Sequence, residues 1–133
     1  MTTRRVLHVD DEPDIRSIVE ISLGLDPNLT ILSCGSGEEA LAAATKCRPD
    51  LILLDVMMPV MDGPTTLERL RGNPATSDVP VVFMTARAQT RELEHYKSLG
   101  AAGVIAKPFD PMTLAQSVQQ YLPTEENAAP AQL

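Results

Sequence analysis

Five side chains of complementary chemistry stand out, because each lies at the end of a short apolar segment. They are three carboxylates, a hydroxyl and an ammonium group: Asp10, Asp11, Asp55, Thr85 and Lys107. Short apolar segments bounded by polar residues are typical of buried β-strands. The carboxyl ends of neighbouring strands in a parallel sheet border one crevice, so we expect the five groups to meet there.

Such a gathering of carboxylates requires a cation. Two like charges about 4 Å apart repel by about 4 kcal/mol at an effective dielectric constant near 20. The candidate ligands Asp10, Asp11 and Asp55 offer only oxygen atoms, which favours Mg²⁺, or Mn²⁺ in its place, over zinc. Taken singly, an acid such as Asp10, Glu12 or Asp62 is as often a helix cap or a solvated loop charge. The convergence of all five groups favours a metal site.

Asp55 differs from the other acids, because the segment before it, residues 51–54, is apolar throughout. A strand of this kind is buried on both faces and holds the following carboxylate firmly. A rigid carboxylate beside Mg²⁺ can act as a nucleophile and form an acyl phosphate. Phosphoryl transfer needs mainly positioning and neutralisation of charge, which Mg²⁺, Lys107 and Thr85 would supply.

Strands and helices are predicted to alternate along the chain. Strands are predicted over residues 6–9, 30–33, 51–54, 79–84 and 103–106, and helices after Pro13, Ser36 and Asp62 and over residues 90–98 and 110–121. Ser36 and Glu39 form a predicted capping box. Five strand–helix units indicate an α/β fold, a doubly wound five-stranded parallel sheet with helices on both faces, rather than a barrel.

Apolar spacing also predicts the core contacts of the last two helices. The expected core residues are Leu93, Tyr96, Leu99, Met112, Leu114, Val118 and Leu122. We interpret His8 as a core histidine whose hydrogen bonds are satisfied. One compact domain is expected over residues 4–122, followed by a flexible polar tail over 123–133.

Composition excludes several classes of function. Eleven Lys and Arg residues against eighteen Asp and Glu residues give a net charge of −7, and no basic run occurs, so we expect no direct binding of nucleic acid. The apolar runs are too short for a membrane span or a secretory signal, which favours a cytoplasmic protein. Cys34 and Cys47 lack metal-ligand or redox spacing and are expected to be reduced thiols.

Four motifs in this order resemble those of a response-regulator receiver domain of the CheY-like superfamily. They are Val9-Asp-Asp-Glu12, Leu53-Leu-Asp-Val-Met-Met-Pro-Val-Met-Asp-Gly63, Met84-Thr-Ala86 and Ala106-Lys-Pro-Phe109. The resemblance covers about residues 4–122 and implies a flavodoxin-like sheet of strand order 2-1-3-4-5. It also implies a phosphoprotein of a two-component system, not an enzyme beyond self-phosphorylation and slow self-dephosphorylation.

The resemblance assigns a role to each site residue. Asp55 would accept a phosphoryl group from a phosphohistidine on a sensor histidine kinase or a histidine phosphotransfer protein. Asp11 and Asp55 would bind Mg²⁺ directly, Asp10 mainly through water, and Met57 through its backbone carbonyl. Thr85 would bind phosphoryl oxygens, Lys107 would pair with the phosphate, and the peptide bond after Lys107 is expected to be cis.

One position departs from the family pattern. The family usually carries an aromatic residue three positions before the lysine, and here that residue is Val104. Valine cannot swing a ring between exposed and buried positions, so we expect a modest change on phosphorylation, confined near Thr85 and the following loop. Met57 and Arg87 lie two residues after Asp55 and Thr85 and are expected to tune the lifetime of the phosphoryl group.

Alternative functions remain open at this point. The first is a receiver fold that works as a scaffold without phosphorylation. An aspartate-nucleophile phosphohydrolase of the haloacid-dehalogenase type would need a second aspartate at position 57, which is methionine. A flavodoxin-like cofactor carrier would need a phosphate-binding loop where Asp10 and Asp11 lie. We expect a stand-alone receiver with an unidentified downstream target, either as output, relay or phosphate sink, and a homodimer stays open.

Overall fold

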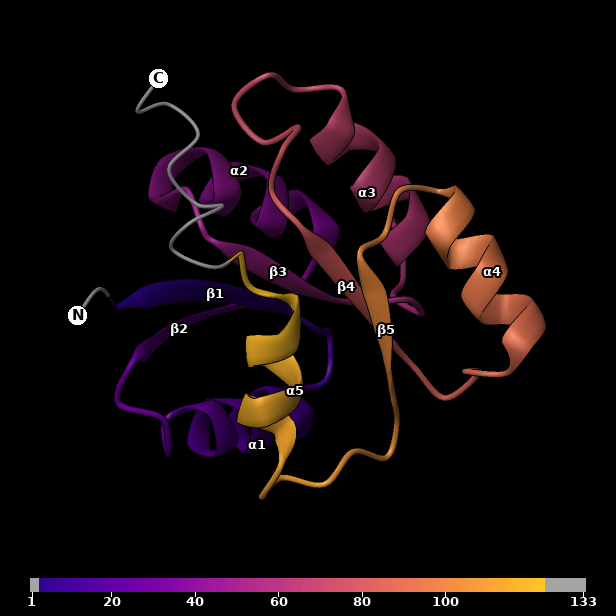
Figure 1. Cartoon of the computed structure of the whole chain (residues 1–133). Helices are drawn as coiled ribbons and strands as arrows, with labels where there is room; N and C mark the ends of the chain where they lie inside the picture. Colours follow the sequence, from indigo (N-terminus) through magenta and orange to yellow (C-terminus); the bar gives the residue numbers. More distant parts are fainter. Residues whose placement is uncertain (1–2, 124–133) are drawn as a thin grey trace.

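The computed structural model describes residues 3–123, and in it five strands alternate with five helices (Figure 1). The elements are β1 (Arg4–Val9), α1 (Pro13–Leu23), β2 (Leu29–Cys34), α2 (Gly37–Cys47), β3 (Leu51–Asp55), α3 (Gly63–Arg71), β4 (Val81–Thr85), α4 (Thr90–Ser98), β5 (Gly103–Ala106) and α5 (Leu114–Tyr121). All strand pairs are parallel, in the order β2-β1-β3-β4-β5. The predicted doubly wound α/β sheet is confirmed.

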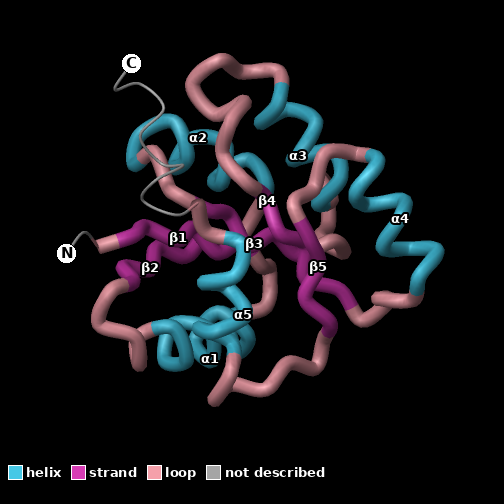
Figure 2. Tube along the Cα trace, in the orientation of Figure 1, coloured by secondary structure: helices cyan, strands magenta, loops and turns pink. Residues whose placement is uncertain are grey.

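Helices cover both faces of the sheet (Figure 2). Helices α1 and α5 lie together on one face, and α2, α3 and α4 lie on the other. Each face buries its own apolar cluster, the first around Val19, Leu23 and Val118 and the second around Ala40 and Leu67. The central strand β3 is buried along its whole length, as its unbroken apolar run predicts.

The register of the sheet brings the carboxyl ends of four strands level. Val9 lies beside Leu54, so the acids that follow them leave the sheet at the same edge. Asp55 lies beside Met84, one residue before Thr85. Thr85 lies beside Ala106, one residue before Lys107. Residues far apart in the sequence therefore meet at one edge.

Side chains cap two of the helices that leave this edge. The Asp62 carboxylate accepts a hydrogen bond from the Thr65 backbone N–H at 2.9 Å and begins α3. The Ser36 hydroxyl accepts from the Glu39 N–H at 3.1 Å, as predicted for α2. The Glu39 carboxylate, however, accepts from the N–H of Gly35 and not from that of Ser36, so the capping box reaches one residue further back than predicted.

The last helix begins later than predicted, at Leu114. The Asp110 carboxylate accepts a hydrogen bond from the Met112 N–H, and the Asp110 carbonyl accepts from the Thr113 N–H, so these residues form a turn. Met112, expected in the core, is 76% exposed on that turn.

The start of β4 and the burial of two leucines also differ from the prediction. Strand β4 begins at Val81 and not at Val79, because the N–H of Val79 bonds to Thr76 and Pro80 has no N–H to donate. In α4 only Tyr96 is buried, whereas Leu93 is half-buried and Leu99, just after the helix, is 40% exposed.

Except for Pro123, the predicted tail over residues 123–133 lies outside the described residues. No helix in the described part of the chain is both long and apolar enough to cross a membrane.

Candidate functional site

Three carboxylates meet at the carboxyl edge of the sheet. Carboxylate oxygens of Asp10, Asp11 and Asp55 all lie within 4.8 Å of one another. Asp10 and Asp55 are buried and Asp11 is half-buried. The adjacent ends of β1 and β3 hold these residues, so the convergence predicted for the acids is what the geometry shows.

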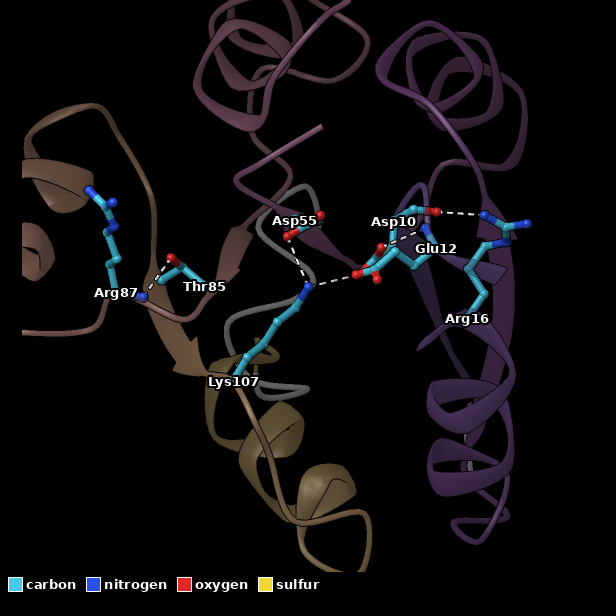
Figure 3. Close-up of polar contacts among 7 residues, drawn as sticks. All are labelled: Asp10, Glu12, Arg16, Asp55, Thr85, Arg87 and Lys107. Carbon is cyan, nitrogen blue, oxygen red and sulfur yellow. Dashed lines mark hydrogen bonds and ion pairs between the residues drawn. The ribbon is translucent and has the colours of Figure 1, made fainter. Parts of the chain in front are cut away.

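Lys107 reaches across this cluster from the end of β5. Its Nζ lies 3.0 Å from Asp10 Oδ2 and 3.0 Å from Asp55 Oδ1 (Figure 3). The Lys107 backbone N–H donates to the Thr85 carbonyl at 2.8 Å, which fixes the start of the lysine against β4. One ammonium group thus bridges two of the three acids, and the cluster keeps an excess of negative charge.

Burial and charge shift the pKa values of this cluster. Desolvation raises the pKa of Asp55 above its ordinary value, and the neighbouring carboxylates add to the rise while Lys107 opposes it. Burial of the Lys107 ammonium works to lower its pKa, but the hydrogen bonds and charges of Asp55 and Asp10 outweigh burial and raise it. Lys107 therefore stays a cation, and the Asp55 carboxylate lacks enough compensating charge.

The acidic turn between β1 and α1 is held by three contacts. The Asp10 N–H donates to the Cys34 carbonyl at 3.1 Å, and the Glu12 N–H donates to Asp10 Oδ1 at 2.9 Å. Arg16 Nη1 donates to the Asp10 carbonyl at 2.7 Å. Arg16 is not among the residues that the sequence predicts for this site; its only signal is that of a cation on the first turns of the helix that follows the acids.

Thr85 lies buried at the end of β4, next to the cluster along the sheet edge. Its Oγ1 accepts a hydrogen bond from the Arg87 backbone N–H at 3.0 Å (Figure 3). The Thr85 hydroxyl is thus held by the β4–α4 loop and shares no hydrogen bond with Asp55 or Lys107 in the described part of the chain. The Arg87 side chain is exposed.

The loop between β3 and α3 passes close beneath Asp55. A Cβ on Gly63 would lie 2.5 Å from the Asp55 carbonyl oxygen, so only glycine fits there. Met58 and Met61 are buried in this loop, so their thioethers pack in the interior beside the oxygen ligands. Met57 and Val60 are 77% and 99% exposed, and Val60 has a positive φ of 71°.

An apolar groove borders the cluster on the side of α1. Its volume is about 330 Å³, and it is lined by Ile15, Ile18, Ala86, Lys107, Pro108, Phe109 and Pro111. The peptide bond between Lys107 and Pro108 is cis, as expected. The groove gives the site an apolar rim beside its charged floor.

His8 lies two residues before Asp10 and is fully buried, as predicted. No described residue offers a hydrogen-bond partner to its ring nitrogens, so the expected hydrogen bonds do not come from protein groups there. Burial lowers the pKa of His8 to about 4 and keeps the ring neutral.

The donor set fits a hard divalent cation. Every ligand that the cluster offers is a carboxylate oxygen, and the oxygens are close enough to share one ion. One lysine balances one charge of three, so a divalent cation would supply the missing positive charge.

Comparison with known proteins agrees with the fold and the motifs. The response regulator receiver domain family matches residues 6–119. Sporulation initiation phosphotransferase F of Bacillus subtilis is 35% identical over 127 residues, which are 96% of this chain and 100% of that protein. The solved structure of the chemotaxis response regulator CheY4 of Vibrio cholerae superposes with a TM-score of 0.83 and 36% identity, over 91% of this chain and 100% of the other.

Several curated relatives are longer proteins. The DNA-binding dual master transcriptional regulator RpaA of Synechocystis is 35% identical over 118 residues, which are 89% of this chain and 48% of that protein. The chain thus spans about half the length of many of the curated relatives it matches.

Proposed function

The chain belongs to the response regulator receiver domain family of two-component signalling, and from this premise we propose that Asp55 is its phospho-acceptor. The observation that carries the proposal is the bridge from Lys107 to the carboxylates of Asp10 and Asp55, each at 3.0 Å. It places one fixed cation beside a buried carboxylate at the floor of an open site. A nucleophile for phosphoryl transfer needs this arrangement.

In the proposed step a carboxylate oxygen of Asp55 attacks the phosphorus of a phosphohistidine on the donor. The O–P bond of an acyl phosphate forms as the N–P bond breaks, and the electron pair of that bond stays on the imidazole nitrogen. Burial, with the neighbouring carboxylates, raises the pKa of Asp55, and a more basic carboxylate is a stronger nucleophile. Lys107, whose Nζ lies 3.0 Å from Asp55 Oδ1, would pair with the incoming phosphoryl oxygens.

We propose Mg²⁺ as the ion of this site, with Mn²⁺ able to replace it. Asp11 and Asp55 would hold it directly, Asp10 through water and Met57 through its backbone carbonyl. Bound there, the ion would neutralise phosphoryl oxygens and bring them toward Asp55. The excess negative charge and the all-oxygen donor set support this assignment.

Thr85 is proposed as the residue that senses the phosphoryl group. Its hydroxyl oxygen accepts from the Arg87 N–H, which leaves the hydroxyl proton free to be donated to a phosphoryl oxygen when Asp55 is modified. The new bond would draw Thr85 toward Asp55 and shift the β4–α4 loop, which is tied to Thr85 through the Arg87 N–H. A phosphoryl group adds charge of about −1.5 to −2, which is enough to reorganise such a loop.

The proposed partners follow from the same chemistry. A histidine kinase or a histidine phosphotransfer protein would supply the phosphoryl group, and the apolar groove beside Lys107 offers surface for its approach. Signalling in place of enzymatic turnover, and a cytoplasmic location, are part of this proposal. Since the relatives include a DNA-binding regulator, the lack of direct nucleic-acid binding stays a prediction, as do the domain bounds and a homodimer.

Intact-mass spectrometry after incubation with acetyl phosphate and Mg²⁺ tests the proposal. We expect the mass of one phosphoryl group on the native protein and none on Asp55→Asn. Asp14→Asn removes an exposed carboxylate from the first turn of α1 and serves as the matched control, which should be modified like the native protein. Omitting Mg²⁺ should abolish the adduct.

Other results would favour the alternatives. No adduct, with acetyl phosphate or with a phosphorylated histidine donor, would support a scaffold that works without phosphorylation. An adduct that persists in Asp55→Asn would place the acceptor elsewhere. Sustained hydrolysis of small phosphate esters would support a phosphohydrolase.

A further inference from the structure

Arg16 contacts the acidic turn in an unusual way for a cation beside three carboxylates. Its Nη1 donates to the backbone carbonyl of Asp10 at 2.7 Å, and no carboxylate among the described residues lies within ion-pair distance of it (Figure 3). Lys107, in contrast, binds the carboxylate oxygens themselves. Arg16 thus brings positive charge to the site without covering any oxygen that a metal would use.

The Asp10 carbonyl belongs to the peptide that joins the two neighbouring acids. Fixing this carbonyl fixes the plane of the peptide and, with it, the direction in which Asp11 leaves the strand. The Asp10 side chain is held separately, by Lys107 and by the Glu12 N–H. Asp11 has no such side-chain contact within the described residues, so the orientation of the peptide before it is its main constraint.

Gly35 leaves the space that the guanidinium group occupies. A Cβ at this position would lie 3.2 Å from Arg16 Nη1 and 3.7 Å from Arg16 Cζ. The Gly35 N–H donates to the Glu39 carboxylate at 2.8 Å, so the start of α2 is tied to the same place. The guanidinium group therefore occupies a niche that Gly35 leaves open beside the Asp10 carbonyl.

We propose that Arg16 is a positioning residue for the metal site, which orients the Asp10–Asp11 peptide so that the Asp11 carboxylate faces the cluster. The inference rests on the proposed Mg²⁺ site, since it concerns how that site is organised before the ion binds. The niche at Gly35 and the contact to a carbonyl in place of a carboxylate both support an orienting role over charge compensation.

The direction in which Mg²⁺ affinity changes in Arg16→Gln distinguishes an orienting role of Arg16 from a purely electrostatic one. Removing a nearby cation by Arg16→Gln would by itself strengthen the binding of Mg²⁺, since the repulsion between like charges is lost. Loss of an orienting contact weakens it instead, typically by tenfold or more for residues that position metal ligands. We expect Arg16→Gln to bind Mg²⁺ about tenfold more weakly and Arg16→Lys to fall between it and the native protein.

The experiment measures affinity for Mg²⁺ alone by calorimetry, and for Mn²⁺ by loss of the free-ion EPR signal, beside the melting temperature. Arg71→Gln is the matched control, because Arg71 also donates to backbone carbonyls, those of Val79 and Gly100, but on α3 away from the cluster. It should lower the melting temperature and leave metal affinity unchanged. Gly35→Ala keeps every charge, crowds the niche, and should weaken metal binding.

Equal or tighter metal binding by Arg16→Gln, with native binding intact, would overturn the positioning role and leave the proposed function standing. A native protein that binds neither ion would overturn the metal site and this inference together. Weakened binding that tracks melting temperature equally in Arg16→Gln and Arg71→Gln would show a structural effect only and would also overturn the positioning role.

Discussion

Phe83 and Tyr96 meet edge to face, with ring centroids 5.1 Å apart and ring planes at 61°. Phe83 lies in β4 beside Val104 of β5, and Tyr96 is the one buried residue in α4. The aromatic ring that packs on Phe83 therefore comes from Tyr96 of α4 and not from β5. Val104, at the position where the family usually carries an aromatic residue, packs at the margin of the same cluster.

Tyr96→Ala should detach α4, because the helix has no other buried side chain. We expect a loss of about 3 kcal/mol in the free energy of unfolding, measured by urea titration, with faster amide hydrogen exchange along α4. Tyr96→Phe keeps the ring and should cost under about 1 kcal/mol. Similar losses from both substitutions would contradict an anchoring role for the ring.

Val104→Tyr should be destabilising, since the space beside Phe83 already holds Tyr96. Overpacking of this kind costs about 1–3 kcal/mol. In the double variant Val104→Tyr, Tyr96→Ala the new ring can occupy the vacated space, so the total cost should be clearly less than the sum of the two single costs. Strict additivity would show that the two sites are independent.

The response to phosphorylation should stay local. Because Tyr96 holds α4 and Val104 offers no ring to move, we expect NMR shift changes on modification of Asp55 to concentrate at Thr85 and residues 86–89. In Tyr96→Ala the changes should extend along α4. Large chemical shift changes throughout β5 and α5 of the native protein would contradict this expectation.

Lys107→Met should make stability depend on the metal. Without Lys107 the buried carboxylates of Asp10 and Asp55 lose their cation, which costs about 3 kcal/mol when one partner of a buried pair is removed. We expect a lower melting temperature in chelator, a larger recovery with Mg²⁺ than in the native protein, and slower adduct formation. Lys97→Met, an exposed change on α4, should show none of these effects.

Acid should destabilise the protein in part through His8. Its pKa is about 4 in the folded protein and 6.5 when unfolded, so the unfolded chain binds the extra proton between these values. The contribution to stability is complete above pH 6.5 and is lost as the pH falls through 4, by about 3 kcal/mol in all. His8→Leu should flatten the pH dependence over this window; an unchanged slope would assign it to other groups.

Gly63→Ala should displace Asp55, the proposed acceptor, without altering any charge. A Cβ there would meet the backbone of Asp55 at 2.5 Å, and backbone cannot turn aside as a side chain can. We expect a loss of about 2 kcal/mol or more and slower phosphorylation by acetyl phosphate. At Gly72 a Cβ would have ordinary contacts, the nearest at 3.6 Å, so Gly72→Ala should be tolerated.

The sequence predicts the sheet well because its signals are local. The apolar run before Asp55 marks β3, and polar residues at the ends of such runs mark the site, since parallel strands must end together. The first residue of a helix follows less directly from apolar spacing. Asp110 forms a turn, so α5 begins only at Leu114 and Met112 is exposed. That choice depends on side-chain hydrogen bonds and not on periodicity.

Arg16 and the Tyr96 anchor could not be predicted in the same way. Arg16 acts on a backbone carbonyl whose place depends on how α1 returns over β1, and its niche depends on Gly35 in another loop. Tyr96 has the spacing of a core residue, as do Leu93 and Leu99, but only the packed sheet decides which one is buried. Tertiary packing alone settles such contacts.

Because Lys107 follows β5, the charge balance of the site depends on the docking of this last strand. Its contacts to Asp10 and Asp55 join residues 97 and 52 positions apart in the sequence. During synthesis the acids emerge long before their cation, and contacts of such long range form only when the last strand docks on the sheet. A chain cut before Lys107 would therefore carry Asp55 but not the cation that lies beside it. The charge balance of the site is thus completed only when β5 has joined the sheet.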